Sequence, residues 1–570
     1  MNDNNNSSVS KSKNDNKSIE VDGSYKEGGG QILRNTVTYA VLLQTKSVAI
    51  TNIRANRTRS PGVRPQHLAG MKLAVEMGNY EHPASPSPRG GGGRNDDGRG
   101  ELVGAEVGAK TVSFVHRSRS ATVGDEGESY RDGSADDTTT TEHFIADTGT
   151  AGSIALLLQA AFLPAMVRAM RRRVGLTSCR TQPNNPPSTT MPAVKVELRG
   201  GTNAMGAPQI DYITDVFAPF INSYFQQYDY DMNKIPSVAA EPPPLDIQII
   251  KRGYYPKGGG IVHVNLRPPS SLLISSKKPG RTTFPPIRLT KCRPIGSISI
   301  KVFHAGKCPA WVAEKMASGA MKELKRAWRD DPRFRNRFSN VGATNDNDNE
   351  NNGSSVDDDE CGTARGKTTS PIIDGATVRI THEVNCLGSG SGILIVAHPE
   401  NSNDNDDDDD GHPTKTPTSL PHHPPLASSG LGDRKVPPLQ TGGNAAKELV
   451  ECIASGGCVD RWLQDQLIPF MALADNGGSS AQQRSEVLVG ELTLHSQTAM
   501  HVAERMTGCK FDVERVMVDR GVGVGGGDTA AAAAAGDEKQ DGDDDNAYGE
   551  AGRIVGGHII RCRGIGFSYA

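Results

Sequence analysis

A short unit recurs along this chain and constrains its fold more than any other feature. The unit is a strand, a glycine-rich turn, and then a helix or a second strand, with turns at residues 27–30, 200–202 and 257–260. Apolar residues alternate in the strands and recur at every third or fourth position in the helices. This recurrence is consistent with an internal repeat of one small structural unit.

Segments of low sequence complexity separate the patterned blocks. They lie at residues 83–100, 117–141, 340–370, 399–425, 475–486 and 521–549. Each has too little apolar surface to offset the entropy lost on ordering, so we interpret them as expanded surface loops. Without them and the polar N-terminal tail, residues 1–17, roughly 350–400 residues remain, which suffices for one large and one smaller domain.

The order of the predicted strands and helices changes near residue 297. A strand and a long helix follow there, and two further strands come after the Asn/Asp-rich segment. We therefore predict a small inserted α/β domain at residues 287–400, followed by a low-complexity loop at 401–425. The large domain then comprises residues 18–286 and 426–570.

The composition and the apolar pattern exclude several classes of protein. The 570 residues carry a formal net charge of −3, which excludes a uniformly basic nucleic-acid coat, so any anion site must be local. The most apolar run, residues 154–167, is too short to span a bilayer and contains Gln159 and Pro164. The nine cysteines include no CxxC pair, and the N-terminus has no apolar signal segment. We therefore expect a soluble, intracellular protein with reduced thiols.

Residues 492–506 hold the strongest candidate for a reactive group. The stretch begins with strand-like alternation and then becomes helical, with Ala499, Val502 and Met506 on one face. His495 lies at the predicted joint, where the positive end of the helix dipole disfavours a second proton on the imidazole. A neutral imidazole is a nucleophile. On this stretch alone, a histidine in a turn without any chemistry remains an open alternative.

Two glycine-containing loops are candidate anion sites. Glu27 and three glycines precede a helix predicted from residue 31 to about 43, with Arg34 one turn inside. Four arginines surround the Ser-Pro-Gly turn at residues 60–62, namely Arg54, Arg57, Arg59 and Arg64. Each guanidinium offers a planar fork of donors that suits phosphate. An ordinary glycine turn and a solvated basic loop are the alternatives at these two places.

Polar residues interrupt two apolar helices. Gln159 lies inside the first of them, and a single buried glutamine is usually structural. Asp465 and Gln466 lie inside a helix predicted at residues 459–474, upstream of the histidine stretch. We expect Asp465 to be buried with a partner, whereas Asp460 fits a helix cap or a surface residue.

Eight runs of residues together resemble the RNA 3'-terminal phosphate cyclase family. They are residues 27–34, 61–67, 146–153, 199–204, 207–212, 252–260, 465–468 and 494–498. They occur in the family's order and extend over essentially all of the patterned sequence from Val21 to Gly566. The low-complexity insertions are what this chain adds to the family's shorter form.

The resemblance implies both a fold and an activity. The fold is α/β (α+β), with a large domain of repeated four-stranded-sheet/two-helix units and a smaller inserted α/β domain. The activity is ATP-dependent conversion of an RNA 3'-phosphate to a 2',3'-cyclic phosphodiester, a ligase-type nucleotidyl transfer. A histidine takes AMP from ATP and releases pyrophosphate, the AMP passes to the RNA 3'-phosphate, and the neighbouring 2'-hydroxyl then expels it.

The resemblance also implies roles for individual residues. His495 matches the family's nucleophile, and Glu27 resembles its metal-side carboxylate, which would serve Mg²⁺ or Mn²⁺. The ATP contacts would be Gln159, Pro208, Trp462, Asp465 and Gln466, and the phosphate or RNA contacts would be Arg34, Arg54, Arg57 and Gln66. Trp462 stands where the family usually has tyrosine, which keeps base stacking but not a hydroxyl contact. The arginine loop is one residue longer than usual, so the separate roles of Arg57 and Arg59 stay open.

Two alternatives belong to other functional classes. A non-catalytic cyclase-like factor for pre-rRNA processing shares the fold but lacks the nucleophilic histidine, so His495 and the Asp465–Gln466 pair argue against it. An enolpyruvyl transferase has similar repeated units but does not explain residues 494–498. As a cyclase, the chain would bind ATP and RNA with a 3'-phosphate, with no membrane and no obligate protein partner. By the resemblance we expect it in the nucleus, with the cytoplasm as the alternative and secretion excluded.

Overall fold

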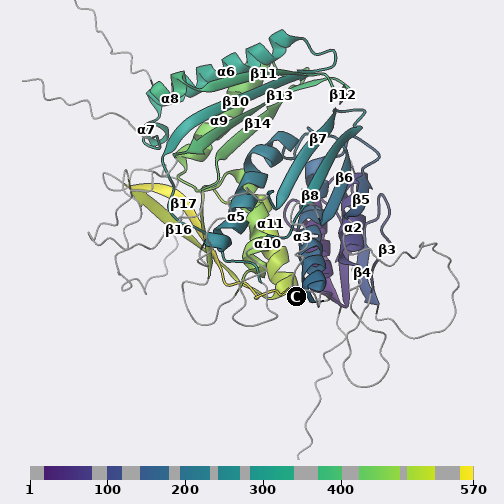
Figure 1. Cartoon of the computed structure of the whole chain (residues 1–570). Coiled ribbons are helices and arrows are strands. Elements are labelled where there is room, and N and C mark those ends of the chain that lie inside the picture. Colours follow the sequence, from purple (N-terminus) through teal and green to yellow (C-terminus); the bar gives the residue numbers. More distant parts are fainter. Residues whose placement is uncertain are drawn as a thin grey trace, which may run out of the picture.

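The computed structural model describes residues 18–58, 60–79, 99–117, 141–178, 193–230, 242–269, 283–338, 370–400, 423–475, 484–519 and 553–568. Within these residues the chain forms four sheets. Three of them make up the main body of the molecule. The fourth, with its helices, lies at the top of Figure 1.

The first sheet shows the folding unit in its simplest form. Its elements are β1 (Ile19–Asp22), α1 (Gly30–Leu42), β2 (Ser47–Thr51), α2 (Pro65–Gly78), β3 (Arg99–Val103) and β4 (Val112–Arg117). β1 and β2 are parallel, and β4 pairs antiparallel with both β2 and β3, which gives the order β1-β2-β4-β3. Ile50 and Phe114 from the sheet and Val37 from α1 are buried in a shared core.

The second sheet repeats this order. Its elements are β5 (Glu142–Asp147), α3 (Ile154–Ser178), β6 (Val194–Gly200), α4 (Ile210–Tyr212), the π-helical turn η1 (Ile213–Phe217), α5 (Ala218–Tyr230), β7 (Leu245–Gly253) and β8 (Gly260–Leu266). α4, η1 and α5 follow one another without a break and serve as the second helix of the unit. The strands run β5-β6-β8-β7, with β5 parallel to β6, and the short strand β12 (Cys386–Leu387) adds to the free edge of β7.

The third sheet has the same order again, although its strands are far apart in the sequence. Its elements are β9 (Arg288–Leu289), α10 (Arg461–Leu473), β15 (Ser485–Val489), α11 (Leu494–Thr507), β16 (Phe511–Asp519) and β17 (Arg553–Cys562). β9 is parallel to β15, and the strands run β9-β15-β17-β16. The prediction of repeated units, each a four-stranded sheet with two helices, is confirmed.

A small unit is inserted between β9 and α10 of the third repeat. It contains β10 (Ile295–Ala305), α6 (Ala310–Asp330), α7 (Pro332–Arg335), α8 (Pro371–Asp374), β11 (Thr377–Glu383), β13 (Gly390–Pro399), β14 (Leu426–Leu431) and α9 (Pro438–Ala454). Its sheet runs β11-β10-β13-β14. α6 and α9 approach so closely that a Cβ on Gly442 would lie 1.8 Å from the carbonyl oxygen of Met316. This contact requires glycine, because any side chain would push the two helices apart.

The small unit extends further along the chain than the sequence indicated. β14 pairs with β13, and Leu449 and Ile453 of α9 lie in the separate core under α6. The prediction that residues 426–454 belong to the large domain is therefore wrong, and they are part of the small unit. Local sequence patterns did not predict this, because β13 and β14 pair with each other although a long low-complexity segment separates them in the sequence.

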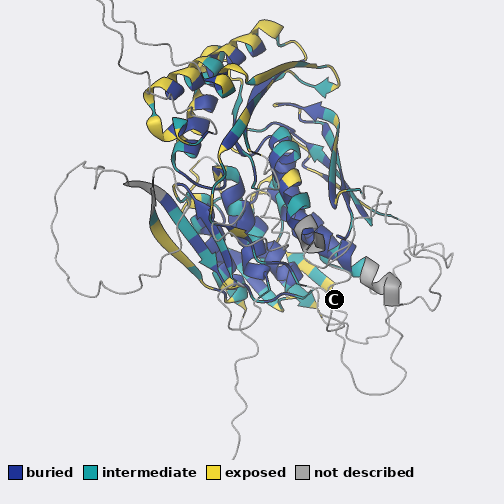
Figure 2. Cartoon of the chain, turned by 60° about the vertical axis from the view of Figure 1, so that its left-hand side comes forward, coloured by how far each residue is buried: buried dark blue, intermediate teal, exposed yellow. Residues whose placement is uncertain are grey.

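The apolar segment predicted at residues 154–167 continues as the longer helix α3. Among the described residues, α3 is the one helix with a window, Ile154–Arg172, that is long and apolar enough to cross a membrane. However, 78% of that window is buried inside the protein. Figure 2 shows the dark blue of buried residues along the central helices, as expected for a core helix.

Candidate active site

A cleft of about 710 Å³ takes its walls from all three repeats. The first repeat contributes α1, the loop before α2 and the first turn of α2. The second contributes α3 and three loops, and the third contributes α10 and the start of α11. The cleft is lined by ten of the predicted residues, namely Glu27, Arg34, Arg54, Arg57, Gln66, Gln159, Pro208, Trp462, Asp465 and His495. Gln466 instead lines a smaller neighbouring cavity, and Arg59 lies outside the described residues.

His495 is the second residue of α11, not a residue at the end of a strand. β15 ends at Val489, and the predicted strand-like start at residue 492 is an irregular connection. The helix begins where it does because the Thr493 hydroxyl accepts a hydrogen bond from the backbone N–H of Ser496 at 3.0 Å. The buried Gln464 of α10 accepts from the Thr493 backbone N–H and from the Ser496 hydroxyl. Gln464, which the sequence did not single out, thus fixes the start of the helix that carries the histidine.

A chain of hydrogen bonds sets the tautomer of His495. Gln31 Nε2 donates to Asp465 Oδ2 at 2.5 Å, which turns the amide oxygen of Gln31 toward the imidazole. His495 Nδ1 lies 2.9 Å from that oxygen. Because an amide oxygen only accepts, Nδ1 carries the proton and Nε2 keeps its lone pair. Gln31 was part of a recognised motif but was not assigned a role, because its two partners are more than 400 residues away.

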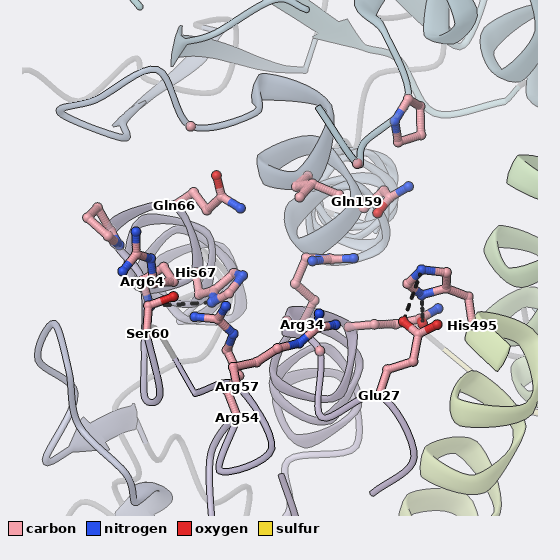
Figure 3. A pocket seen from close by; sticks show the side chains of 18 of the residues that line it. Glu27, Arg34, Arg54, Arg57, Ser60, Arg64, Gln66, His67, Gln159 and His495 are labelled. Atoms are coloured by element: carbon pink, nitrogen blue, oxygen red, sulfur yellow. Dashed lines mark hydrogen bonds and ion pairs between the residues drawn. The ribbon is translucent and has the colours of Figure 1, made fainter. Parts of the chain in front are cut away.

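The surroundings of His495 favour the neutral imidazole. Burial lowers the pKa of His495, and the positive charges of Arg34, Arg461 and Arg57 lower it further. The Glu27 carboxylate, 3.5 Å from Nε2, acts in the opposite direction. The sequence predicted a neutral imidazole at His495 because of the helix dipole. In the structure, burial is the largest cause of the lowered pKa. Figure 3 shows Glu27 and His495 facing each other on one side of the cleft.

Arg34 and Asp465 form the inner wall of the cleft. Burial lowers the pKa of Arg34 to about 10, so the guanidinium stays charged at neutral pH. Burial also raises the pKa of Asp465 to about 7, and the nearby Arg34 charge opposes this rise. Asp465 thus has the buried position and the partner, Gln31, that its place in the helix predicted.

The arginine loop concentrates positive charge on the other side of the cleft. Burial lowers the pKa of Arg54, and repulsion from Arg64 and Arg57 lowers it further. Within the described residues, none of the ion pairs involves these three side chains. A bound anion would relieve this repulsion. Gln66 lies beside the loop in Figure 3. Its amide oxygen accepts a hydrogen bond from the backbone N–H of Ser153, so its amide nitrogen points away from Ser153.

His67 is a buried second histidine in the same cleft. Burial lowers its pKa to about 3, with a further contribution from Arg34. Its Nδ1 lies 3.4 Å from the backbone N–H of Arg64, which leaves the proton on Nε2. A Cβ on Gly30 would come within 2.1 Å of that Nε2, so the glycine lets the imidazole reach the first turn of α1. His67 ends the run of residues 61–67 that resembles the cyclase family, but the sequence alone indicated no role for it.

The low pKa of His67 predicts a specific dependence of stability on pH. The unfolded histidine takes up a proton near pH 6.5 and the folded one only near pH 3, so wild type loses stability as pH falls below 6.5. We expect the wild type to lose stability relative to His67→Gln by up to roughly 1.4 kcal/mol per pH unit below that value. Urea unfolding of both proteins at pH 7 and pH 5 measures this. A difference that stays constant between the two pH values would show that the pKa of His67 is the same in the folded and unfolded states.

Two polar atoms next to the cleft lack partners. Among the described residues, Trp462 Nε1 and Gln466 Oε1 are buried without a hydrogen bond. The amide nitrogen of Gln466 donates a hydrogen bond to the backbone oxygen of Trp462 at 2.5 Å. Such orphaned groups cost free energy unless a ligand or water pairs with them.

Comparison with known proteins agrees with this geometry. The sequence model of one family, RNA 3'-terminal phosphate cyclase, matches residues 25–85 and 98–513 of the chain. This chain belongs to the RNA 3'-terminal phosphate cyclase family.

Several proteins named RNA 3'-terminal phosphate cyclase resemble the chain along most of its length. The one from Thermococcus gammatolerans is 30% identical over 505 residues, which cover 88% of this chain and 96% of that protein. The one from Pyrococcus abyssi is 28% identical and covers 87% and 95%, respectively. The one from Drosophila melanogaster is 27% identical and covers 87% and 93%. As a member of the cyclase family, the chain is thus matched over both the repeats and the small unit.

Proposed function

We propose that this chain is an RNA 3'-terminal-phosphate cyclase (ATP), a ligase-type enzyme that converts an RNA 3'-phosphate to a 2',3'-cyclic phosphodiester. The names of its relatives support the reaction class. One observation carries the proposal for this chain. His495 has its Nδ1 proton held by Gln31 and its Nε2 free beside Glu27, in a cleft lined by four arginines of the first repeat, Arg34, Arg54, Arg57 and Arg64.

In the proposed first step, Nε2 of His495 attacks the α-phosphorus of ATP. The bond from that phosphorus to the bridging oxygen breaks, and pyrophosphate leaves with the electron pair. The imidazole then holds AMP on Nε2 and keeps its proton on Nδ1, which donates a hydrogen bond to the amide oxygen of Gln31. Splitting a difficult transfer in this way is the advantage of covalent catalysis. Arg34 and the arginine loop are placed to stabilise the departing negative charge.

In the next two steps the AMP moves to the RNA and is then expelled. An oxygen of the RNA 3'-phosphate attacks the α-phosphorus, and the phosphorus–nitrogen bond breaks to restore the neutral histidine. The 2'-hydroxyl then attacks the RNA phosphorus, loses its proton, and releases AMP as the leaving group. Gln159, Pro208 and Trp462 would hold the adenosine through these steps.

A divalent cation could bind in the cleft as a complex with the phosphates of ATP. Among the described residues, no three His, Cys, Asp or Glu side chains gather as a metal site. Mg²⁺ or Mn²⁺ bound to nucleotide phosphates needs only one or two protein carboxylates, because water fills its other positions. We propose Glu27 as this carboxylate, and the ion would neutralise charge on the triphosphate.

Two measurements test the proposed function. Incubation with ATP labelled at the α-phosphate and a divalent ion should leave acid-labile label on the denatured chain. A 5'-labelled oligoribonucleotide with a 3'-phosphate should become resistant to phosphatase when ATP is present. If the chain takes up no label and the oligonucleotide stays phosphatase-sensitive, the proposal is wrong.

The hydrogen bond from His495 to Gln31 predicts the effect of a single substitution. Gln31→Ala removes the acceptor that holds the Nδ1 proton, so we expect the rate of label uptake to fall roughly 10- to 100-fold. The pH dependence of that rate should also change, since both tautomers become populated. Rapid-quench kinetics from pH 5.5 to 8.5 measures both. Gln248→Ala, an exposed glutamine on β7, serves as the control and should behave as wild type.

A further inference from the structure

Two thiols lie in contact at the junction of the third repeat and the small unit. Cys292 Sγ is 2.8 Å from Cys458 Sγ, and the Cys292 thiol also lies 2.9 Å from the carbonyl oxygen of Gly456, to which it donates. A disulfide bond is about 2.05 Å long, so the two sulfurs need to move little to form one. The whole small unit separates these cysteines in sequence, and only the fold brings them together.

The pair joins the two connections through which the chain enters and leaves the small unit. Cys292 lies between β9 and β10, and Cys458 lies between α9 and α10. The backbone N–H of Cys458 donates to the carbonyl oxygen of Leu488 at 2.8 Å, which anchors the second connection on β15. A bond between the two sulfurs would therefore fasten both connections just before the start of α10.

Cys292 has the surroundings of a reactive thiol. It is half-buried and borders a surface pocket together with Arg337 and His423. The contact with Cys458 lowers the pKa of Cys292 to about 7, against the effect of burial, and the charge of Arg337 adds to this. Cys458 is 4% exposed, and its contact with Cys292 and its burial raise its pKa. Cys292 is thus the thiolate that reacts first, and Cys458 is the thiol that resolves.

We propose that Cys292 and Cys458 are a thiol–disulfide pair that reacts reversibly with low-molecular-weight disulfides such as oxidised glutathione. The Cys292 thiolate attacks one sulfur of oxidised glutathione, forms a mixed disulfide and releases one reduced glutathione. Cys458 loses its proton and attacks the Cys292 sulfur, which expels the second reduced glutathione. Two electrons pass from the protein to the oxidant, and reduced thiols reverse the reaction. This property is independent of the proposed enzymatic function.

The test is oxidation of the full-length protein with glutathione at several ratios of its oxidised and reduced forms. After an acid quench, denaturation and alkylation, peptide mapping should find a peptide that joins Cys292 to Cys458. The alkylated forms of both peptides should be lost in parallel. On a gel without reductant the chain should migrate faster, because the new bond closes a loop around the small unit, and dithiothreitol should restore the original position.

Matched variants decide between this pair and other thiols. Cys292→Ser should abolish both the joined peptide and the fast band, while its hydroxyl can still donate to Gly456. Cys509→Ser, at a buried thiol two residues after the end of α11, should leave both intact. The proposal is overturned if Cys292 stops at the mixed disulfide with glutathione, if the joined peptide contains Cys452 in place of Cys458, or if both thiols remain free.

Discussion

His495→Ala will take up no label from ATP labelled at its α-phosphate. The substitution removes the only atom proposed to form the bond to AMP, so we expect labelling below about one-thousandth of wild type. The conversion of a 3'-phosphorylated oligoribonucleotide should fall by a similar factor, because both later steps depend on the first. Stability should change little, since the side chain is half-buried and, among the described residues, its polar contacts are the hydrogen bond to Gln31 and the Glu27 carboxylate at 3.5 Å.

His501 provides the matched control on the same helix. It lies six residues further along α11, and its ring stacks on Tyr25 with centroids 4.0 Å apart, away from the residues that line the cleft. His501→Ala should keep the label and the cyclisation activity of wild type. If His495→Ala is fully labelled, or if only His501→Ala loses its label, His495 is not the nucleophile and the proposed mechanism is wrong. Pre-formed RNA adenylate should still cyclise with His495→Ala, because that substrate enters after the histidine has acted.

Asp460→Ala will produce the largest loss of stability among the substitutions considered for this chain. Asp460 is 1% exposed and accepts four hydrogen bonds that link three parts of the molecule. The donors are the backbone N–H groups of Trp462 and Leu463 at the start of α10, the hydroxyl of Tyr212 in the second repeat, and the backbone N–H of Ala427 in β14. Alanine leaves all four donors unpaired in the interior. We expect the free energy of unfolding to fall by about 3–5 kcal/mol.

Asp331→Ala is the control for a simple helix cap. Asp331 caps the short helix α7 near the surface and accepts from the backbone N–H of Arg333 and from its exposed guanidinium. Because an exposed ion pair adds little, the loss of Asp331 should cost only about 1 kcal/mol. Urea unfolding of the two variants and wild type compares them directly. If Asp460→Ala costs no more than Asp331→Ala, Asp460 is only a cap and does not join the three parts. The sequence interpretation of Asp460 left open a cap and a surface residue, and the structure shows a buried cap.

Local patterns predicted the elements that bury one apolar face. The helix expected from residue 31 to about 43 is α1, Gly30–Leu42, and the helix expected at residues 459–474 is α10, Arg461–Leu473. The period of apolar residues determines such helices, and only the ends move with their caps. The glycine turns did not mark the copies one by one, because residues 27–30 lie in the first repeat whereas residues 200–202 and 257–260 both lie in the second.

Contacts between distant segments were beyond the reach of local patterns. β9 has two residues and no apolar alternation, yet it completes the third sheet through its pairing with β15. α9 packs on α6 across the gap that separates them in sequence, so its membership in the small unit followed only from the fold. The orientation of Gln31 likewise depends on Asp465, and the resemblance to known motifs named both segments without joining them.

The three-repeat construction has a practical consequence for measuring the protein itself. Glu27 and Arg34 belong to the first repeat, Gln159 to the second, and Asp465 and His495 to the third, so no repeat alone contains a complete cleft. Under the proposed mechanism each correctly assembled chain accepts one AMP, and a chain with one misplaced repeat accepts none. The moles of AMP bound per mole of chain would then count the native molecules in a preparation, as an active-site titration does.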